Sequence, residues 1–414
     1  MSSYSKKRSN GGNSRNDDIP QSQQSECDGL KMETTTQPRE NCCTWKVAAV
    51  FLIIVAASLV LAWVVLPAED IVAKYIPDFE EPANPYKGPE AGTPGENSGG
   101  GSDSDGQTPD DGEDDLIGTV VPSFMQCPEG ELCCNGSVDN CKLRVDEMMF
   151  GLVHNAMASE EKGFIVGYNH RLGLVKALMA GYRGLNLDVC NCDGILQFCH
   201  EICDLGERVP NEIFTNTVQF LKDYPSEVVV LLFQASTEKT PIVWNDLDGE
   251  MIKVDGFSDM IYVHTYGDTW PTMGDLVQQN KRIIIFYMNG GDCTNDECPS
   301  GFHYFYNYAA ETQFESASLD DLQNYAYSCE ITRGPADDAP IPASFFAVNN
   351  FVTPPDVEAS KIANSKESLD SRLTECANLN NMRPNFVYID FWSEGETAKW
   401  IQYANQQKAQ QSGQ

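Results

Sequence analysis

Two histidines in this sequence stand where they could act as an acid–base pair. The chain of 414 residues contains five histidines, and two of them, His154 and His200, follow short apolar segments that are expected to be strands. Cleavage of a phosphodiester by a neighbouring hydroxyl group needs a base that takes the hydroxyl proton and an acid that protonates the leaving oxygen. A single histidine is more often a packed or surface residue, but two at strand ends favour acid–base chemistry.

A carboxylate could orient one of these imidazoles. Asp390 lies near the end of the last apolar segment, and across the mouth of a barrel it would reach His154. Such a carboxylate holds an imidazole in the tautomer that a general base needs. A capping or structural role for Asp390 is the alternative, and the sequence leaves both open.

Oxygen-bearing side chains near the same strand ends could bind a cation. Asn155 follows the first strand, Asn186 and Asp188 lie on the second, and Gln234 follows the fourth. Carboxylate and amide oxygens are the ligands that Ca²⁺ prefers, and a cation would neutralise charge that develops on phosphorus. Because the set holds a single carboxylate, the sequence indicates at most a weak Ca²⁺ site.

These side chains need a scaffold of alternating strands and helices. Apolar runs predict strands at residues 148–153, 185–189, 195–199, 227–233, 282–287, 344–348 and 385–391. Apolar spacing predicts helices at residues 171–181, 212–222, 271–280 and 358–376. Continuously apolar strands are typical of parallel sheets covered on both faces, and closure into a barrel leaves no exposed edge. We therefore predict an α/β fold, a TIM-type (β/α) barrel over residues 116–405, with its functional side chains at the carboxyl ends of the strands.

Several segments together resemble a known family. They read GLVHNAM, GYRGLNLDVCNCDGILQFCHEIC, FLKDYPSEVVVLLFQ, GDTWPTMGDLVQQNKRIIIF and RPNFVYIDFW. In this order they resemble the X region of phosphatidylinositol-specific phospholipase C, and the later ones resemble the plant and microbial branch of the PLC-like phosphodiesterases. The resemblance spans roughly residues 127–405. It implies a distorted TIM barrel in which His154 is the general base and His200 the general acid.

The resemblance also implies a ligand set from which this chain departs. In calcium-dependent members the ligands would fall on Asn155, Asn186, Asp188 and Gln234. Asn186 and Gln234 stand where those members carry carboxylates, and Asp188 stands where metal-free bacterial members carry an arginine. Arg183 is the alternative cation, although its place in the turn before the second strand favours a structural ion pair.

The residues that precede the barrel predict a membrane anchor. Residues 47–66 are apolar and uncharged over the length that a helix needs to cross a bilayer, and the 46 residues before them are too long and polar for a signal peptide, the alternative reading. Basic residues before this span place the N-terminus in the cytosol, so a single-pass type II membrane protein with an extracellular or lumenal barrel is expected. Composition predicts a disordered cytosolic tail at 1–46, an acidic Gly/Ser/Pro linker at 67–115 and a disordered C-terminal tail at 406–414.

Cysteine usage agrees with this topology. Three of the 15 cysteines precede the span, which leaves an even number for disulfides in an oxidising compartment. Cys190, Cys192, Cys199 and Cys203 could instead form a zinc cluster, but the expected compartment favours disulfides. A glycosylation sequon at Asn135 is compatible with the same compartment.

The leading hypothesis is a phosphoric diester hydrolase that cleaves a lipid or glycerol phosphodiester by His/His acid–base catalysis, with a phospholipid or related phosphodiester as its substrate. A formal net charge of −33 disfavours nucleic acid as a partner. The weak ligand set motivates an alternative, a catalytically weak or inactive barrel that binds a phosphate headgroup or a protein partner at the cell surface. A third reading, a glycerophosphodiester hydrolase of the same fold, would need a carboxylate-rich metal site that we do not find in the sequence.

Overall fold

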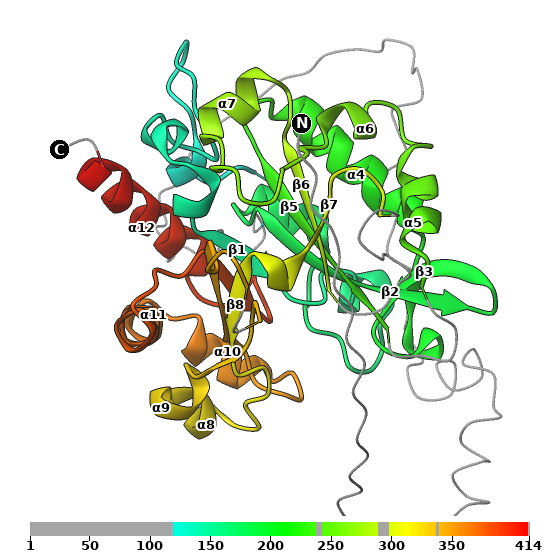
Figure 1. The fold of residues 1–414 in the computed structure, drawn as a ribbon. Helices are drawn as coiled ribbons and strands as arrows, with labels where there is room; N and C mark the ends of the chain where they lie inside the picture. Colours follow the sequence, from blue (N-terminus) through cyan, green and yellow to red (C-terminus); the bar gives the residue numbers. More distant parts are fainter. Residues whose placement is uncertain (1–117, 119, 237–241, 289–297, 337–338, 413–414) are drawn as a thin grey trace, which may run out of the picture. The chain divides into compact units, whose positions relative to one another are not determined.

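The computed structural model describes residues 118, 120–236, 242–288, 298–336 and 339–412 (Figure 1). The predicted tail, span and linker at residues 1–46, 47–66 and 67–115 lie outside this part of the chain. Among the helices that the structure describes, none is both long and apolar enough to span a membrane.

The described strands form one curved, mostly parallel sheet. In chain order they are β1 (Phe150–Val153), β2 (Gly184–Cys192), β3 (Ile195–Cys199), β4 (Glu207–Arg208), β5 (Val229–Ala235), β6 (Ile283–Met288), β7 (Phe302–Tyr304), β8 (Ala309–Thr312), β9 (Ile331–Arg333), β10 (Phe345–Asn350) and β11 (Phe386–Ile389). The hydrogen-bonded order is β7-β6-β5-β2-β1-β11-β10-β8-β9, with β9 antiparallel to β8. The predicted α/β architecture is therefore confirmed.

The closed barrel that we predicted is not what these strands form. Their order has two ends, at β7 and β9, so the described sheet is an open half-barrel. Only residues 305–308 separate β7 from β8, and Phe305–Asn307 form a 3-10 turn. Because two parallel neighbours need a crossover of about a dozen residues or more, β7 and β8 cannot pair side by side.

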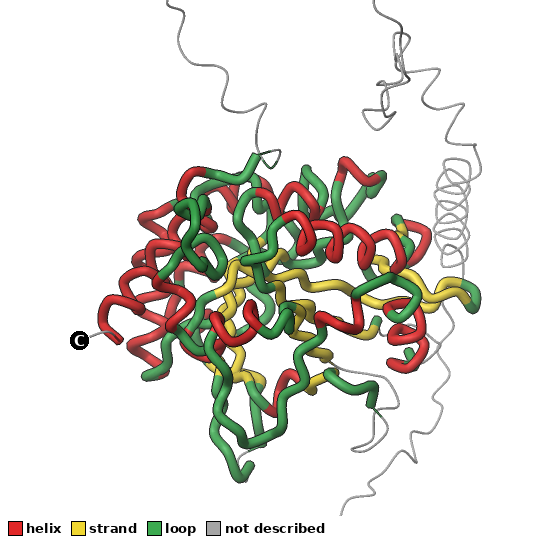
Figure 2. The backbone as a smooth tube through the Cα atoms, turned by 90° about the horizontal axis from the view of Figure 1, so that it is seen from above, coloured by secondary structure: helices red, strands yellow, loops and turns green. Residues whose placement is uncertain are grey.

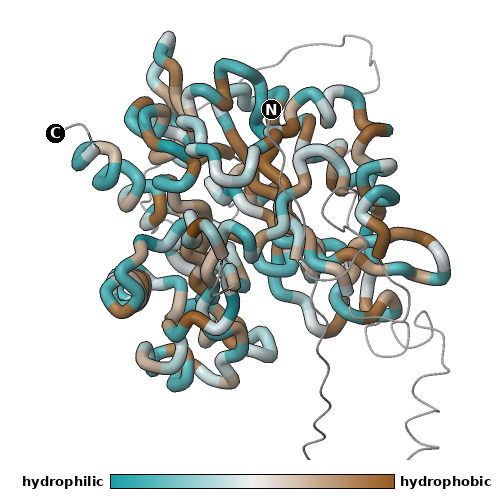
Figure 3. Tube along the Cα trace, in the orientation of Figure 1, coloured by the Kyte–Doolittle hydropathy of each residue, from teal (hydrophilic) through white to brown (hydrophobic). Residues whose placement is uncertain are grey.

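Strand residues alternate between two apolar layers, as the pleat of a strand requires. One layer holds Val153, Leu231 and Val387 and packs against the helices. The other layer faces away from those helices and is crowded with aromatic rings. Figure 2 shows the strands inside and the helices around them, and Figure 3 shows the hydrophobic residues concentrated on the central strands. A side chain two residues after one of these ring-bearing positions lies on the same face. The side chains at such strand ends therefore point to the concave side of the sheet.

The helices lie between the strands in sequence. Those described are α3 (Leu174–Met179), α4 (Pro210–Asp223), α5 (Trp244–Met251), α6 (Phe257–Met260), α7 (Met273–Gln278), α8 (Leu319–Gln323), α9 (Tyr325–Ser328), α10 (Val357–Ala363), α11 (Lys366–Asn380) and α12 (Thr397–Ser412). Sequence signals explain their starts: α4 begins with a proline, and Thr272 caps α7 by accepting a hydrogen bond from the amide of Asp275.

The predicted helix at residues 358–376 is two helices. The chain leaves the helical path at Asn364 and Ser365, and the Ser365 side chain caps α11. Asn364 is fully buried, and its side-chain amide donates to the carbonyl of Asp390 over 3.0 Å. The break therefore lies at the residue whose side chain binds the end of β11.

The predicted third strand does not belong to the main run of parallel strands. Instead, β3 returns antiparallel along β2 and also pairs with β4. The turn between them is Asp193 and Gly194, whose φ values of 53° and 89° suit a tight hairpin. Continued by two residues, the register of the hairpin brings His200 back to the level of Leu187, next to Asp188 on β2.

Disulfides, not a zinc cluster, hold the extended loops. Ten cysteines of the described residues form five bonds, namely Cys127–Cys133, Cys134–Cys141, Cys190–Cys199, Cys192–Cys203 and Cys329–Cys376. The prediction of disulfides is therefore confirmed.

The sequon at Asn135 does not present its side chain to solvent. Asn135 is 4% exposed, donates to the carbonyl of Val228 over 3.2 Å and accepts from the amide of Val228 over 2.7 Å. A glycan on this nitrogen would break the first bond at a buried position, so the folded chain disfavours glycosylation of this sequon.

The predicted disordered tail at residues 406–414 is also corrected, because α12 continues to Ser412. Ala409 is buried, and Asn405 both accepts from the amide and donates to the carbonyl of Met149 over 2.8 Å. These contacts fix α12 beside the start of β1, so the folded domain extends past residue 405.

Replacing Asn405 should therefore destabilise the whole domain. Asn405→Ala leaves two buried backbone groups of Met149 without partners, and we expect a loss of roughly 1–3 kcal/mol in unfolding free energy, measured by urea denaturation. Gln407→Ala, at an exposed position of the same helix, is the matched control and should change stability little. Equal stabilities of the two variants would contradict this role of α12.

Candidate functional site

His154 is oriented by Asp390 at the ends of two neighbouring strands. β1 and β11 are parallel, and Val153 pairs with Ile389, so the next residue on each strand lies side by side. His154 Nδ1 lies 2.9 Å from Asp390 Oδ1. Because the carboxylate accepts this hydrogen bond, Nδ1 carries the proton and Nε2 keeps its lone pair. The Asp390 side chain is 1% exposed and that of His154 is 13% exposed, so the imidazole retains access to solvent.

Two residues that the sequence analysis missed support this pair. Asn169 donates to Asp390 Oδ1 over 2.9 Å. His170 is buried, and its Nδ1 accepts from the amide of Trp392, so its Nε2 donates to the carbonyl of His154. Burial lowers the pKa of His170 to about 4, so this ring stays neutral. Both residues follow a strand by more than ten positions, and no local pattern marks them.

Aromatic rings fix the plane of the His154 imidazole. Phe351 stacks on it with the ring centroids 4.0 Å apart, and Phe314 and Tyr388 meet it edge on at 6.4 Å. A packed ring with one hydrogen-bonded nitrogen cannot rotate freely. The second nitrogen is therefore held in one direction.

Each predicted catalytic side chain is followed by a residue with left-handed backbone. The φ values are 47° at Asn155, 63° at Glu201 and 45° at Phe391. Residues other than glycine rarely adopt this conformation, and such strain, on the order of 1 kcal/mol or more per residue, gathers at functional sites. At each of these positions the chain turns sharply just after the predicted catalytic residue.

His200 is held in place from the opposite segment. Its Nδ1 lies 2.6 Å from the carbonyl of Gly167, so Nδ1 donates and Nε2 is the free nitrogen. Burial is the main cause that lowers the pKa of His200, and the charge of His154 lowers it further. The two imidazoles therefore lie within reach of each other's charge, and a bound phosphate anion would raise the pKa of His200.

The predicted cation ligands lie on neighbouring strands, but the side-chain amide of Asn186 is already hydrogen-bonded to backbone groups. Asp188 and Gln234 are register partners on β2 and β5. Asn186 Oδ1 accepts from the amide of Asn155 over 3.2 Å, and its Nδ2 donates to the carbonyl of Leu232 over 3.4 Å. The Asn186 amide therefore serves the backbone rather than a ligand.

Asp188 is the lone carboxylate of this set. It is 5% exposed, and its Oδ1 has no hydrogen-bond partner among the described residues. Burial raises its pKa to about 7, a shift that the charge of His154 opposes and that of Glu201 supports. Calcium takes several ionised oxygen ligands, so one half-ionised carboxyl and a committed amide fit calcium poorly.

Two arginine side chains near the strands form ion pairs with glutamates. Arg183 forms a buried ion pair with Glu227 over 2.6 Å, which confirms its structural reading. Arg333, which the sequence analysis missed, lies on β9, 3.1 Å from the buried carboxylate of Glu311. Its guanidinium covers the ring of Phe314, the same ring that meets His154.

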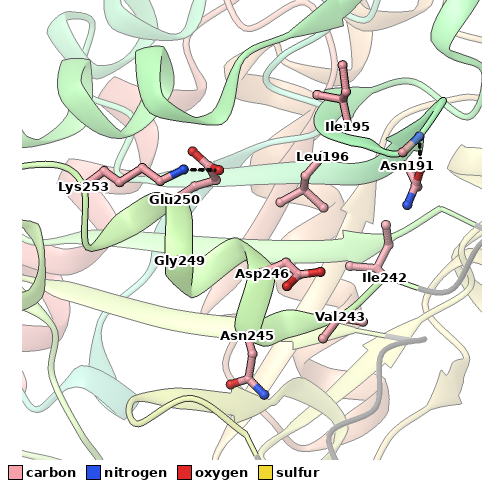
Figure 4. A pocket seen from close by; sticks show the side chains of 11 residues that line it. Asn191, Ile195, Leu196, Ile242, Val243, Asn245, Asp246, Gly249, Glu250 and Lys253 are labelled. Carbon is pink, nitrogen blue, oxygen red and sulfur yellow. Dashed lines mark hydrogen bonds and ion pairs between the residues drawn. The ribbon is translucent and has the colours of Figure 1, made fainter.

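A cavity of about 450 Å³ lies elsewhere, between the β2–β3 hairpin and α5 (Figure 4). Its wall includes Asn191, Leu196, Asp246 and the Glu250–Lys253 ion pair. None of its lining residues is a predicted catalytic or ligand residue, so we place the candidate site at the strand ends and not in this cavity.

The raised pKa of Asp188 should appear in the pH dependence of stability. The folded chain disfavours the charged form, so stability decreases as pH rises from the ordinary value of 3.8 through about 7. Asp188→Asn removes this cost, and above pH 7 we expect it to be more stable than the parent by up to roughly 4 kcal/mol. Below pH 4 the two should be equally stable. Urea denaturation in EDTA, with exposed Asp204→Asn as the control, measures the difference, and a difference independent of pH would contradict the shift.

Two solved phospholipases are among the structures similar to this chain. A phosphatidylinositol-specific phospholipase C from Listeria monocytogenes aligns at 14% identity and a TM-score of 0.44 over 64% of this chain and 97% of that one. A mutant of the phosphatidylinositol-specific phospholipase C from Staphylococcus aureus aligns at 11% identity and a TM-score of 0.42 over 63% and 93% of the two chains.

Curated relatives carry the same family description. PI-PLC X domain-containing protein 1 of Arthroderma benhamiae is 26% identical over 303 residues, which are 69% of this chain and 92% of that protein. A PI-PLC X domain-containing protein of Arabidopsis thaliana is 22% identical over 290 residues, 65% of this chain and 63% of that protein. The family model for PI-PLC X matches residues 153–405, more than half of the sequence and all of the site described above, and the chain belongs to the PI-PLC X family.

Proposed function

We propose that this chain is a phosphoric diester hydrolase that acts on a phospholipid-type substrate, with His154 as general base and His200 as general acid. The observation that carries the proposal is the His154–Asp390 hydrogen bond, which leaves one nitrogen of a partly exposed, rigidly packed imidazole free to accept a proton. Family membership supports the same reaction class.

The proposed reaction is an internal displacement at phosphorus. His154 Nε2 takes the proton of a hydroxyl group next to the phosphodiester, and the hydroxyl oxygen forms a bond to phosphorus. The bond from phosphorus to the leaving oxygen breaks. His200 enters this step as the imidazolium: its Nδ1 proton stays with the carbonyl of Gly167, and its Nε2 proton passes to the leaving oxygen. The products are a cyclic phosphodiester and a free alcohol, such as diacylglycerol from a phospholipid. Asp390 stabilises the imidazolium that forms at His154.

Calcium has no step in this proposal. Asn186 is engaged by backbone groups, and the Asp188 carboxyl has a raised pKa because it is buried. Removal of Ca²⁺ with EDTA should therefore leave the rate unchanged.

A second candidate function is a barrel that binds a phosphate headgroup or a protein partner without turnover. The specific observation behind it is the lowered pKa of His200, because an acid must be protonated before it can donate. Binding of headgroup without product formation would support this candidate over the first.

We also propose that the barrel lies outside the cytosol, anchored as a single-pass type II membrane protein by residues 47–66. Five disulfides in the described residues support an oxidising compartment. In sealed microsomes, a protease added outside should leave the barrel intact and remove an N-terminal epitope tag. Degradation of the barrel with retention of the tag would reverse the topology.

The activity test uses the full-length chain and radiolabelled phosphatidylinositol. We expect release of a cyclic inositol phosphate, and a loss of about 10²–10⁴-fold in kcat for His154→Asn, His200→Asn and Asp390→Asn. His264→Asn is the matched control: His264 stacks on Trp270 away from the site, so this variant should remain active. Equal activity of His154→Asn and His264→Asn would refute the acid–base assignment.

A further inference from the structure

Both ends of the segment that carries His200 are tied to one strand. Cys199 precedes His200 and is bonded to Cys190, and Cys203 follows it and is bonded to Cys192. Both partners lie on β2. These two bonds tie both ends of this short segment to β2, in addition to the hydrogen bond between His200 and the carbonyl of Gly167.

The two disulfides lie against each other. The sulfur atoms of Cys192, Cys199 and Cys203 all lie within 4.8 Å of one another. Across the described residues this is the one group of three such sulfurs, so the other disulfides there have no third sulfur in reach. A thiolate at Cys203 would therefore have Cys199 Sγ as its nearest new disulfide to attack.

The two bonds differ in access. Cys190 and Cys199 are fully buried, whereas Cys192 and Cys203 are partly exposed. An external reductant reaches the outer bond first, because thiol–disulfide exchange needs approach to a sulfur. Direct attack on the buried inner bond by the same reagent is disfavoured.

From this juxtaposition we propose that the paired disulfides form a thiol–disulfide exchange site, which accepts a dithiol reductant and transfers the exchange inward to Cys199. Only the predicted effect of this exchange on catalytic activity rests on the proposed function. Its product has a new Cys199–Cys203 bond and thiols at Cys190 and Cys192. Both covalent ties between β2 and the His200 segment are then broken.

The steps balance as follows. A thiolate of the dithiol attacks Cys192 Sγ, and the electron pair of the old bond leaves on Cys203. The Cys203 thiolate attacks Cys199 Sγ, so Cys199–Cys203 forms, Cys190–Cys199 breaks, and Cys190 takes a proton. The second thiol of the reagent then closes on its own sulfur, which releases Cys192 as a thiol. The chain gains two electrons and two protons, and the reagent becomes a cyclic disulfide.

Limited reduction of the full-length chain with dithiothreitol tests the exchange. After brief exposure, alkylation and peptide mass spectrometry should find labels on Cys190 and Cys192, and a peptide linked through Cys199 and Cys203. The partly exposed Cys127–Cys133 bond should be reduced without a change of partners, and the buried Cys329–Cys376 bond should resist. Labels on Cys192 and Cys203 with Cys190–Cys199 intact would overturn the proposal.

A variant separates exchange from direct reduction. In the Cys192→Ser/Cys203→Ser chain the outer sulfurs are absent, so Cys190 should stay unlabelled at the same dithiothreitol concentration. Labelling of Cys190 in this variant would show that the inner bond is reached directly and would also overturn the proposal. If this double variant does not fold, as judged by circular dichroism, the time course of the parent chain decides: labels on Cys190 must appear together with the Cys199–Cys203 peptide.

The consequence for the site is measured separately. Activity on phosphatidylinositol should fall when the Cys199–Cys203 bond forms and return after reoxidation to the original pairs. Because the disulfide map is read by mass spectrometry, an inactive parent chain would count against the proposed function and not against the exchange. Full activity of the rearranged chain would refute the link between Cys199 and His200.

Discussion

The His154–Asp390 hydrogen bond depends on the parallel register of β1 and β11, and the remaining features of the site are arranged around it. Parallel neighbours end at the same edge of a sheet, so the residue after Val153 meets the residue after Ile389. Asn169 holds the carboxylate, and Asn364 holds the carbonyl of Asp390. The break between α10 and α11 exists at the residue that makes this last contact. Local helix geometry and the position of the site are thus coupled.

The site contains features that oppose stability. Asp188 is buried, with one oxygen that no described residue pairs, and three residues beside the predicted catalytic side chains have left-handed backbone. Buried unpaired groups and strained φ values are each unfavourable, and they persist where surrounding packing overrides them. Here the ring-lined concave side of the sheet and the helix-covered outer side supply that packing. The unfavourable features, namely this buried oxygen of Asp188 and the strained φ values, gather at one edge of the sheet. This concentration is a physical argument for function that is independent of sequence similarity.

The two proposed catalytic histidines are supported in different ways. His154 is positioned by the core, through strand register, hydrogen bonds and stacking on Phe351. His200 follows the hairpin strand β3, and two disulfides tie its segment to β2 in addition to its hydrogen bond to the carbonyl of Gly167. A covalent tie holds a short segment without a large core, but it makes the position depend on which sulfur is bonded to which.

The sequence by itself determined the parallel α/β class, most strand positions and the two histidines at strand ends, because apolar runs and strand-end polar residues are local patterns. It also determined that the cysteines would pair, since their number and the predicted compartment are readable without coordinates. Only the tertiary structure decided that the described sheet is open, that residues 195–199 form a hairpin and that α12 continues through 406–412. The sequence also did not reveal the hydrogen bonds of Asn169 and His170 at the site or the Arg333–Glu311 ion pair beside it. His154 and Asp390 are 236 residues apart, and contacts at such separation are set by packing of the whole chain, which no local pattern records.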